Sequence, residues 1–135
     1  MFCLDTDVII GVMTRRARAV SERLAIEIAR GTRLIVPAPV LFELRYGAAK
    51  SAAPARSHAR LDDFLVVVSE IATFDPTDAG EAGDIRAYLE SKGIPIGPFD
   101  VLIAAQARRR SLPLVTSNVR EFSRVPGLIV TDWAA

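Results

Sequence analysis

Three acidic residues stand where a solvated surface carboxylate is not expected. Asp5 follows the apolar run Phe2–Leu4, Glu43 has apolar neighbours on both sides, and Asp100 falls in the first turn of an otherwise apolar helical segment. Each has an ordinary explanation alone, since Asp100 can cap its helix and Glu43 can pair with Arg45 or another arginine. Three carboxylates from separate elements that converge at one crevice would instead repel one another unless a cation neutralised them.

The available ligand types indicate which cation this would be. Carboxylate oxygens suit Mg²⁺, with Mn²⁺ as a substitute. His58 and Cys3 are the only residues of their types, so no zinc cluster is expected, and Cys3 lies in an apolar run typical of a buried, reduced thiol. Magnesium held by carboxylates commonly serves phosphoryl chemistry, where it polarises the phosphate and stabilises the leaving oxygen.

Short apolar segments alternate along the chain with amphipathic helical segments. This order predicts an α/β fold, a three-layer sandwich with a central parallel sheet of four to five short strands and helices on both faces. Ligands bind such sheets at the carboxyl ends of the strands. Two polar clusters fall there, one after the first strand and one after the fourth: Asp5, Thr6 and Asp7, then Thr116, Ser117 and Asn118.

The expected element boundaries follow from the hydrophobic periodicity and from glycine and proline positions. The expected strands are 2–4, 34–36, 71–74, 112–116 and 128–130. The expected helices are 16–30, 37–49, 58–68, 78–92 and 99–110, with a helical turn at 119–122 and a flexible connection at 50–57.

Length and composition restrict the possible classes of protein. The 135 residues, 50% of them hydrophobic, suit one domain with its own core. Seventeen basic residues nearly balance sixteen acidic ones, and the formal charge of +1 excludes a polybasic, histone-like binder. Asp5 and Asp7 interrupt the apolar amino-terminal segment, and no stretch reaches membrane-spanning length, so we expect a cytoplasmic protein without membrane association.

The chain resembles the PIN-domain ribonucleases and, among them, the VapC-type toxins of bacterial toxin–antitoxin modules. The matching stretches, which extend over essentially the whole chain, are FCLDTDVII, PAPVLFELRYGAAKS and GIPIGPFDVLIAAQARRRSLPLVTSNVREFSRVPGLIVTDW. The resemblance implies that residues 1–135 form a single PIN domain and that Asp5, Glu43 and Asp100 bind the divalent metal. Asn118 falls at a fourth polar position, which is acidic in some members.

The resemblance further implies an endoribonuclease that hydrolyses RNA with a metal-activated water and leaves a 5′-phosphate. Asp5 and Asp100 would hold Mg²⁺, and Glu43 would orient or deprotonate the water. Thr6, Thr116 and Ser117 carry short hydroxyl side chains at strand ends, where they could fix these carboxylates or meet substrate, although turn or cap roles explain the two threonines equally well.

Two departures from the family pattern affect the expected site. Asp7 stands where the family often has Asn, so it either adds negative charge or makes a local hydrogen bond. Because Asn118 is neutral, we expect one tightly bound Mg²⁺, with a second recruited only together with RNA phosphate.

The partners implied by the resemblance are an RNA substrate, a VapB-type antitoxin bound in a hetero-oligomer, and a second copy in a homodimer. Arg120 and Arg124 follow Asn118 and are candidates for substrate or dimer contacts. The run 108–110 is better explained by the favourable position of cations at a helix carboxyl end.

Three other functions remain open from the residues alone. The segment LDTDV also matches the opening motif of haloacid dehalogenase-like phosphatases, with Asp5 as nucleophile and Asp7 as acid, but no lysine follows in 119–135. A phosphoreceiver signalling module would use Asp75 as acceptor and needs a lysine at a strand end, which neither Lys50 nor Lys92 supplies. A non-catalytic RNA-binding domain is the third.

Overall fold

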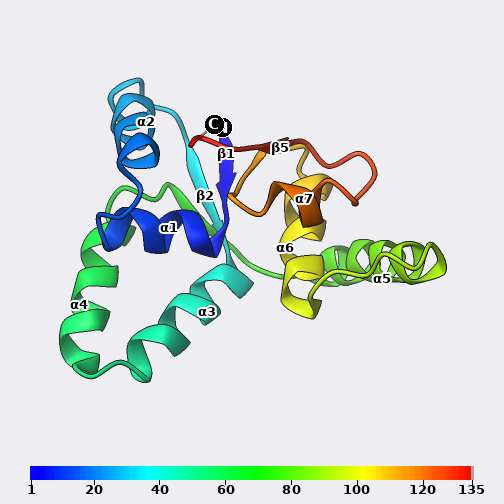
Figure 1. Ribbon diagram of the computed structural model, residues 1–135, viewed down its shortest axis with the longest axis horizontal. Helices are drawn as coiled ribbons and strands as arrows, with labels where there is room; N and C mark the ends of the chain where they lie inside the picture. The colour runs from blue at the N-terminus through cyan, green and yellow to red at the C-terminus, as the bar shows by residue number, and fades with distance from the viewer. Residues whose placement is uncertain (135) are drawn as a thin grey trace.

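A five-stranded parallel sheet forms the centre of the computed structural model, which describes residues 1–134 (Figure 1). The strand order is β3-β2-β1-β4-β5, and every neighbouring pair is parallel. This confirms the predicted α/β class with its parallel sheet. The strands are β1 (Phe2–Leu4), β2 (Leu34–Pro37), β3 (Glu70–Ala72), β4 (Leu114–Val115) and β5 (Val130–Thr131).

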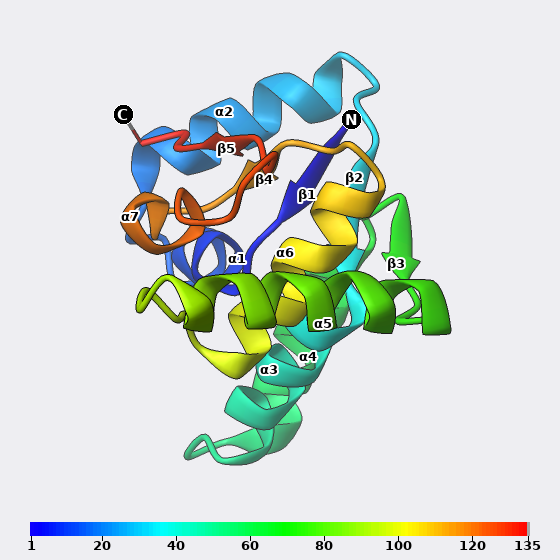
Figure 2. The same cartoon turned by 90° about the vertical axis from the view of Figure 1, so that its right-hand side faces the viewer.

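Helices cover both faces of this sheet, with α1, α2 and α4 on one side and α5, α6 and α7 on the other (Figure 1). The α3–α4 pair extends beyond the end of the strands, and α5 crosses over α6 (Figure 2). No helix within residues 1–134 is both long and apolar enough to span a membrane. The helices are α1 (Thr6–Met13), α2 (Arg18–Ala29), α3 (Ala38–Ala49), α4 (Pro54–Leu65), α5 (Pro76–Ser91), α6 (Pro98–Arg109) and α7 (Val119–Phe122).

Helix α1 is absent from the sequence-based prediction, which treats the residues after β1 as a loop cluster. The helix begins at once because the Asp5 side chain accepts a hydrogen bond from the Thr6 amide at 2.8 Å. Its eight residues are apolar on most sides and so carry no clear amphipathic period. As a result, Asp7 projects from the first turn of a helix rather than from a loop.

The prediction of a flexible connection at 50–57 is wrong at its carboxyl half. Pro54 occupies the first helical position, where its fixed φ and missing N–H favour initiation, and α4 starts there. Only residues 50–53 connect α3 to α4. The α4 helix also ends at Leu65 rather than at Val68, so Val66 is left 82% exposed.

An ion-pair network fastens α6 to α5. Asp78 is fully buried and accepts hydrogen bonds from Arg109 Nε at 2.7 Å and Arg110 Nη1 at 2.9 Å. Asp78 and Asp75 also form a reciprocal capping box at the start of α5. Arg108 pairs with Glu81. All three consecutive arginines therefore hold the two helices together.

Replacing Asp78 by Asn should destabilise the fold by about 3 kcal/mol at neutral pH, because the partly buried Arg109 and Arg110 lose the buried carboxylate that they share. Burial alone would raise the pKa of Asp78, but hydrogen bonds from Arg109, Arg110 and the Asp75 amide outweigh it and lower the pKa from 3.8 to about 2. The ionised carboxylate thus stabilises the fold above about pH 4 and loses that contribution as the pH falls through 2.

Urea unfolding of both proteins at several pH values checks this expectation, and the difference between them should shrink from pH 4 towards pH 2. The exposed pair Arg86–Glu90 provides the control. Glu90→Gln should change stability by less than about 0.5 kcal/mol. An equal loss in both variants would contradict the structural role of Asp78.

Candidate active site

The carboxyl ends of β1 and β4 form the point where the strand order changes direction. From β1 the chain proceeds outwards through β2 and β3, whereas β4 and β5 lie on the opposite side of β1. Such a crevice is the usual ligand site of an open parallel sheet. An open pocket of about 260 Å³ lies here, lined by Asp5, Thr6, Asp7, Ile10, Glu43, Asp100 and Asn118.

The structure therefore brings four carboxylates from three separate regions into one pocket. Asp5 and Asp7 come from the β1–α1 junction, Glu43 from α3 and Asp100 from the first turn of α6. Asn118 joins them from the segment after β4. The four residues that the sequence marks as catalytic candidates all line this pocket.

Asp5 is the most deeply placed of these groups, with 5% of its surface exposed. It accepts hydrogen bonds from the Thr6 amide at 2.8 Å and from Thr116 Oγ1 at 2.7 Å. Burial raises its pKa, the Thr116 hydrogen bond opposes this, and the charges of Asp7 and Asp100 raise it further, to about 7. Asp5 is thus a carboxylate whose ionised form lacks a compensating positive charge.

Glu43 has a different partner from the one its sequence neighbours indicate. The Thr6 hydroxyl donates to Glu43 Oε1 at 3.0 Å. Arg45 instead donates to Asp62 Oδ1 at 2.6 Å and contacts His58 Nδ1. The Glu43–Arg45 alternative is therefore wrong. The Thr6 hydroxyl thus holds Glu43, as the Thr116 hydroxyl holds Asp5. A hydroxyl carries no charge, so these hydrogen bonds fix the two carboxylates without a positive partner.

Asp100 is half-buried at the third position of α6. Burial is the main cause that raises its pKa to about 6, and the charges of Glu43, Glu121 and Asp7 add to it. A Cβ on Gly97 would lie 3.2 Å from Asp100 Oδ2, so glycine leaves the room that this carboxylate occupies.

The segment after β4 contributes a second set of contacts. Ser117 Oγ donates to Asp7 Oδ2, whereas Asp7 Oδ1 is buried without a hydrogen-bond partner. The backbone N–H of Asn118 donates to Thr116 Oγ1 at 3.0 Å, and the side-chain Nδ2 of Asn118 donates to Glu121 Oε2 at 3.2 Å. Asp7 therefore combines the two alternatives considered for it, a local hydrogen bond and additional negative charge.

Sequence reasoning misses Gly97 and Glu121. Gly97 precedes Pro98 at the start of α6, a position typical of an ordinary helix start, and only the distance to Asp100 shows its importance. Glu121 follows Asn118 by three residues, and the helical turn predicted at 119–122 is the signal that could have brought the two side chains together. Arg120 is exposed outside the pocket, and Arg124 donates to the Pro95 carbonyl.

The donor set fits a hard divalent cation. Its groups are all oxygens, Asp7 Oδ1 is buried and unpartnered, and burial together with the neighbouring negative charges raises the pKa of Asp5 and Asp100. Within residues 1–134, however, no three carboxylate, imidazole or thiol groups stand close enough to surround an ion as they are placed.

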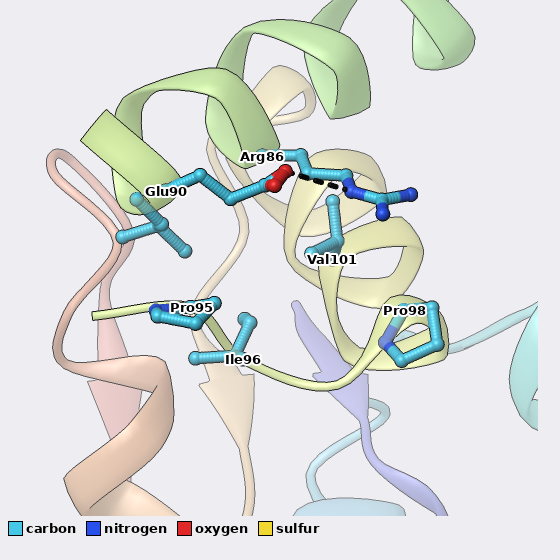
Figure 3. Close-up of a pocket in the computed structure, with 7 residues that line it drawn as sticks. Arg86, Glu90, Pro95, Ile96, Pro98 and Val101 are labelled. Atoms are coloured by element: carbon cyan, nitrogen blue, oxygen red, sulfur yellow. Dashed lines mark hydrogen bonds and ion pairs between the residues drawn. The ribbon is translucent and has the colours of Figure 1, made fainter. Parts of the chain in front are cut away.

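A second hollow, of about 130 Å³, lies between α5 and the segment that leads into α6 (Figure 3). Its charged lining residues, Arg86 and Glu90, pair with each other at 3.2 Å (Figure 3). The rest of its wall is apolar and consists of Leu89, Pro95, Ile96, Pro98 and Val101. This hollow offers no unpaired group for chemistry. The acidic pocket is the better candidate for an active site.

Comparison with known proteins supports the same assignment. The family model described as PIN domain matches residues 2–128. This chain belongs to the PIN domain family. It is 39% identical to the tRNA(fMet)-specific endonuclease VapC of Salmonella typhimurium, and the match covers 98% of this chain and 97% of that relative. It is 33% identical to Ribonuclease VapC2 of Rickettsia felis, with 98% of each chain covered.

Solved structures of the family agree in fold. The structure described as VapBC2 from Rickettsia felis bound to a promoter DNA fragment has a TM-score of 0.90 and 31% identity, with 98% of both chains covered. DNA-bound VapBC from Salmonella typhimurium has a TM-score of 0.89 and 38% identity, with coverage of 98% and 97%. The resemblance to VapC-type PIN-domain nucleases is confirmed, and the phosphatase and phosphoreceiver alternatives are not supported.

Asp100→Asn should stabilise the metal-free protein at alkaline pH. Because the pKa of Asp100 in the fold is about 6, above its ordinary 3.8, the ionised form opposes folding, and stability declines as the pH rises through this interval. At pH 8 the variant should gain about 1 kcal/mol, a figure reduced for the partial exposure of the group. Thermal unfolding in EDTA at pH 4.5 and pH 8 measures the gain.

The exposed Asp84 on α5 offers a charge-matched control, since Asp84→Asn removes one carboxylate far from the pocket. A gain for Asp100→Asn that is equal at both pH values, or no gain at pH 8, would show that repulsion in the pocket is weak.

Proposed function

We propose that this chain acts as one PIN domain that hydrolyses RNA phosphodiester bonds at the pocket of Asp5, Glu43, Asp100 and Asn118, as the toxin of a toxin–antitoxin pair. The observation that carries the proposal is the convergence of uncompensated carboxylates at the switch point of the sheet in a member of this nuclease family.

Asp5, Glu43 and Asp100 are the residues that would hold Mg²⁺, or Mn²⁺ in its place. When bound there, the cation would neutralise the scissile phosphate and lower the pKa of a water molecule. Thr116 and the Thr6 amide fix the Asp5 carboxylate, and the Thr6 hydroxyl fixes Glu43 Oε1. Because Asn118 is neutral, one tight cation site is proposed rather than two.

Glu43 is placed to accept the proton of the attacking water through its second carboxylate oxygen, since Thr6 engages the first. The water oxygen forms a bond to phosphorus as the bond from phosphorus to the 3′-oxygen breaks, and the leaving 3′-oxygen takes up a proton from solvent. The products are a 5′-phosphate and a 3′-hydroxyl, because the RNA 2′-hydroxyl takes no part as nucleophile.

The substrate we propose is a tRNA. Relatives at 39% and 38% identity carry the name tRNA(fMet)-specific endonuclease VapC. An open pocket suits a single-stranded loop, whose bases and backbone can be splayed out, better than a regular duplex.

Asp5→Asn, Glu43→Gln and Asp100→Asn should each reduce RNA cleavage by at least about 100-fold, because each removes a charge from the reacting centre. Cleavage of end-labelled tRNA(fMet) and other tRNAs, with and without EDTA, measures the loss. Circular dichroism checks that the fold persists, and Asp84→Asn should retain activity. Undiminished cleavage by any of the three variants, or products ending in a cyclic phosphate, would contradict the mechanism.

The antitoxin partner is proposed to fill an apolar groove beside the acidic pocket. This groove, of about 250 Å³, shares Ile10 and Glu43 with the acidic pocket and continues along Met13, Leu44 and Leu61. The similar solved structures include toxin–antitoxin complexes. An antitoxin segment with apolar side chains in the groove and an arginine at the carboxylates would displace the cation and so inhibit the enzyme.

A homodimer is proposed through the exposed aromatic surface of α3 and α6. Phe42 and Phe99 pack together with ring centroids 5.3 Å apart, yet remain 53% and 44% exposed, and Tyr46 one turn along α3 is 58% exposed. Three exposed aromatic side chains so close together are typical of an interface rather than of a free surface.

Phe42→Glu should convert the proposed dimer into a monomer, because it introduces a charge where aromatic surface would be buried. Light scattering coupled to gel filtration at several concentrations measures the mass. Val66→Glu places the same charge on an apolar residue that is 82% exposed at the end of α4 and should leave the mass unchanged. A wild-type monomer at all concentrations would overturn this interface.

A further inference from the structure

Arg15 has a backbone conformation that arginine rarely adopts. Its φ is +58°, in the left-handed region, within the turn that connects α1 to α2. Glycine or asparagine is the usual residue there, because a side chain with a Cβ is strained. An arginine at such a position indicates that its side chain is used.

The surrounding turn fixes this conformation tightly. The Gly11 carbonyl accepts hydrogen bonds from the amides of Arg16 at 3.1 Å and Ala17 at 3.3 Å. A Cβ on Gly11 would lie 3.0 Å from Ala17 Cβ, so only glycine lets the turn fold back this closely against α1. The Arg15 side chain therefore starts from a well-defined point beyond the carboxyl end of α1.

Arg15 and Arg60 line the same open hollow, of about 350 Å³, together with Met13 and Thr14. Both side chains are exposed, and neither makes an ion pair among residues 1–134. The nearby Arg18 and Arg45, by contrast, pair with Glu22 and Asp62. The hollow thus presents two guanidinium groups without a protein counter-ion.

The hollow is continuous with the acidic pocket. Met13, Thr14 and Arg60 line both the hollow and the apolar groove, and Ile10 and Glu43 line both the groove and the pocket. The eight residues of α1 separate the two ends, a length of about 12 Å at the usual rise per residue. That length corresponds to a few nucleotides of an extended strand.

We propose that Arg15 and Arg60 bind a backbone phosphate of the RNA strand, a few nucleotides from the bond that is cut at the acidic pocket. This proposal rests on the proposed ribonuclease activity. It adds that the enzyme favours RNA strands long enough to reach from the acidic pocket to the two arginines. The acidic pocket repels a polyanion, and the formal charge of +1 attracts none at long range, so local cations must hold the strand. Guanidinium groups match phosphate oxygens in bidentate geometry, which suits two arginines converging on one hollow.

The test compares long and minimal substrates in two variants chosen to keep the fold. Arg15→Asn removes the charge and places a residue that tolerates positive φ, so stability should be maintained or raised. Arg60→Gln keeps a good helix former on α4. The substrates are a single-stranded oligoribonucleotide of a dozen or so residues and bis(p-nitrophenyl) phosphate, which contains a single phosphodiester.

Each variant should raise KM for the oligoribonucleotide about tenfold, as expected for loss of a charged hydrogen bond, and should leave hydrolysis of bis(p-nitrophenyl) phosphate unchanged. The slope of log KM against log salt concentration should fall by about 0.7 for each phosphate of a single strand that an arginine no longer neutralises. Arg33→Gln is the control, because Arg33 is also exposed but precedes the amino end of β2, whereas the acidic pocket lies at the carboxyl ends of the strands.

Unchanged KM and salt slope in both variants, with wild-type cleavage intact, would overturn the phosphate site while leaving the ribonuclease proposal standing. A loss confined to binding of an antitoxin segment would likewise overturn it, since the arginines would then serve that partner instead. Absence of RNA cleavage by the wild-type protein would refute the ribonuclease proposal itself. Equal effects on the long and the minimal substrate would overturn the remote site as well, because the arginines would then act on the reacting centre.

Discussion

Repulsion among the carboxylates at the end of β1 and β4 is the constraint that the rest of the structure accommodates. Asp5, Asp7, Glu43 and Asp100 share one pocket, and burial, with the neighbouring carboxylate charges added to it, raises the pKa of Asp5 and Asp100. Hydroxyls from Thr6, Thr116 and Ser117 hold three of the carboxylates in place without neutralising them. The protein therefore tolerates a local cost in stability that a bound cation would remove.

Other parts of the fold offset this cost and keep the carboxylates where they are. Helix α6 carries Asp100 at its first turn, and its last turn is fixed by Arg109 and Arg110 on the buried Asp78. Gln106 in the same helix donates to the carbonyls of Ala72 and Thr73, at the carboxyl end of the edge strand β3. The ion pairs with Asp78 thus anchor the carboxyl end of α6, and Asp100 at the amino end of the same helix has no cationic partner.

The parallel sheet and the set of acidic pocket residues could be predicted from the sequence, because both depend on simple patterns. Short apolar runs such as Phe2–Leu4 require neighbours in a sheet, and Asp5 and Glu43 stand out against apolar surroundings. Partners across space could not be predicted. Arg45 is nearest to Glu43 in sequence yet reaches Asp62, and the importance of Gly97 lies in a 3.2 Å approach that no local pattern reveals.

The hydrogen bond from Thr116 to Asp5 joins residues 111 positions apart in the chain. Asp5 therefore leaves the ribosome long before β4 and the segment that fixes its carboxylate. A chain that stops before β4 carries Asp5, Asp7, Glu43 and Asp100 without the strand and the hydroxyl that order the Asp5 carboxylate. The candidate active site is thus complete only after β4 has been made.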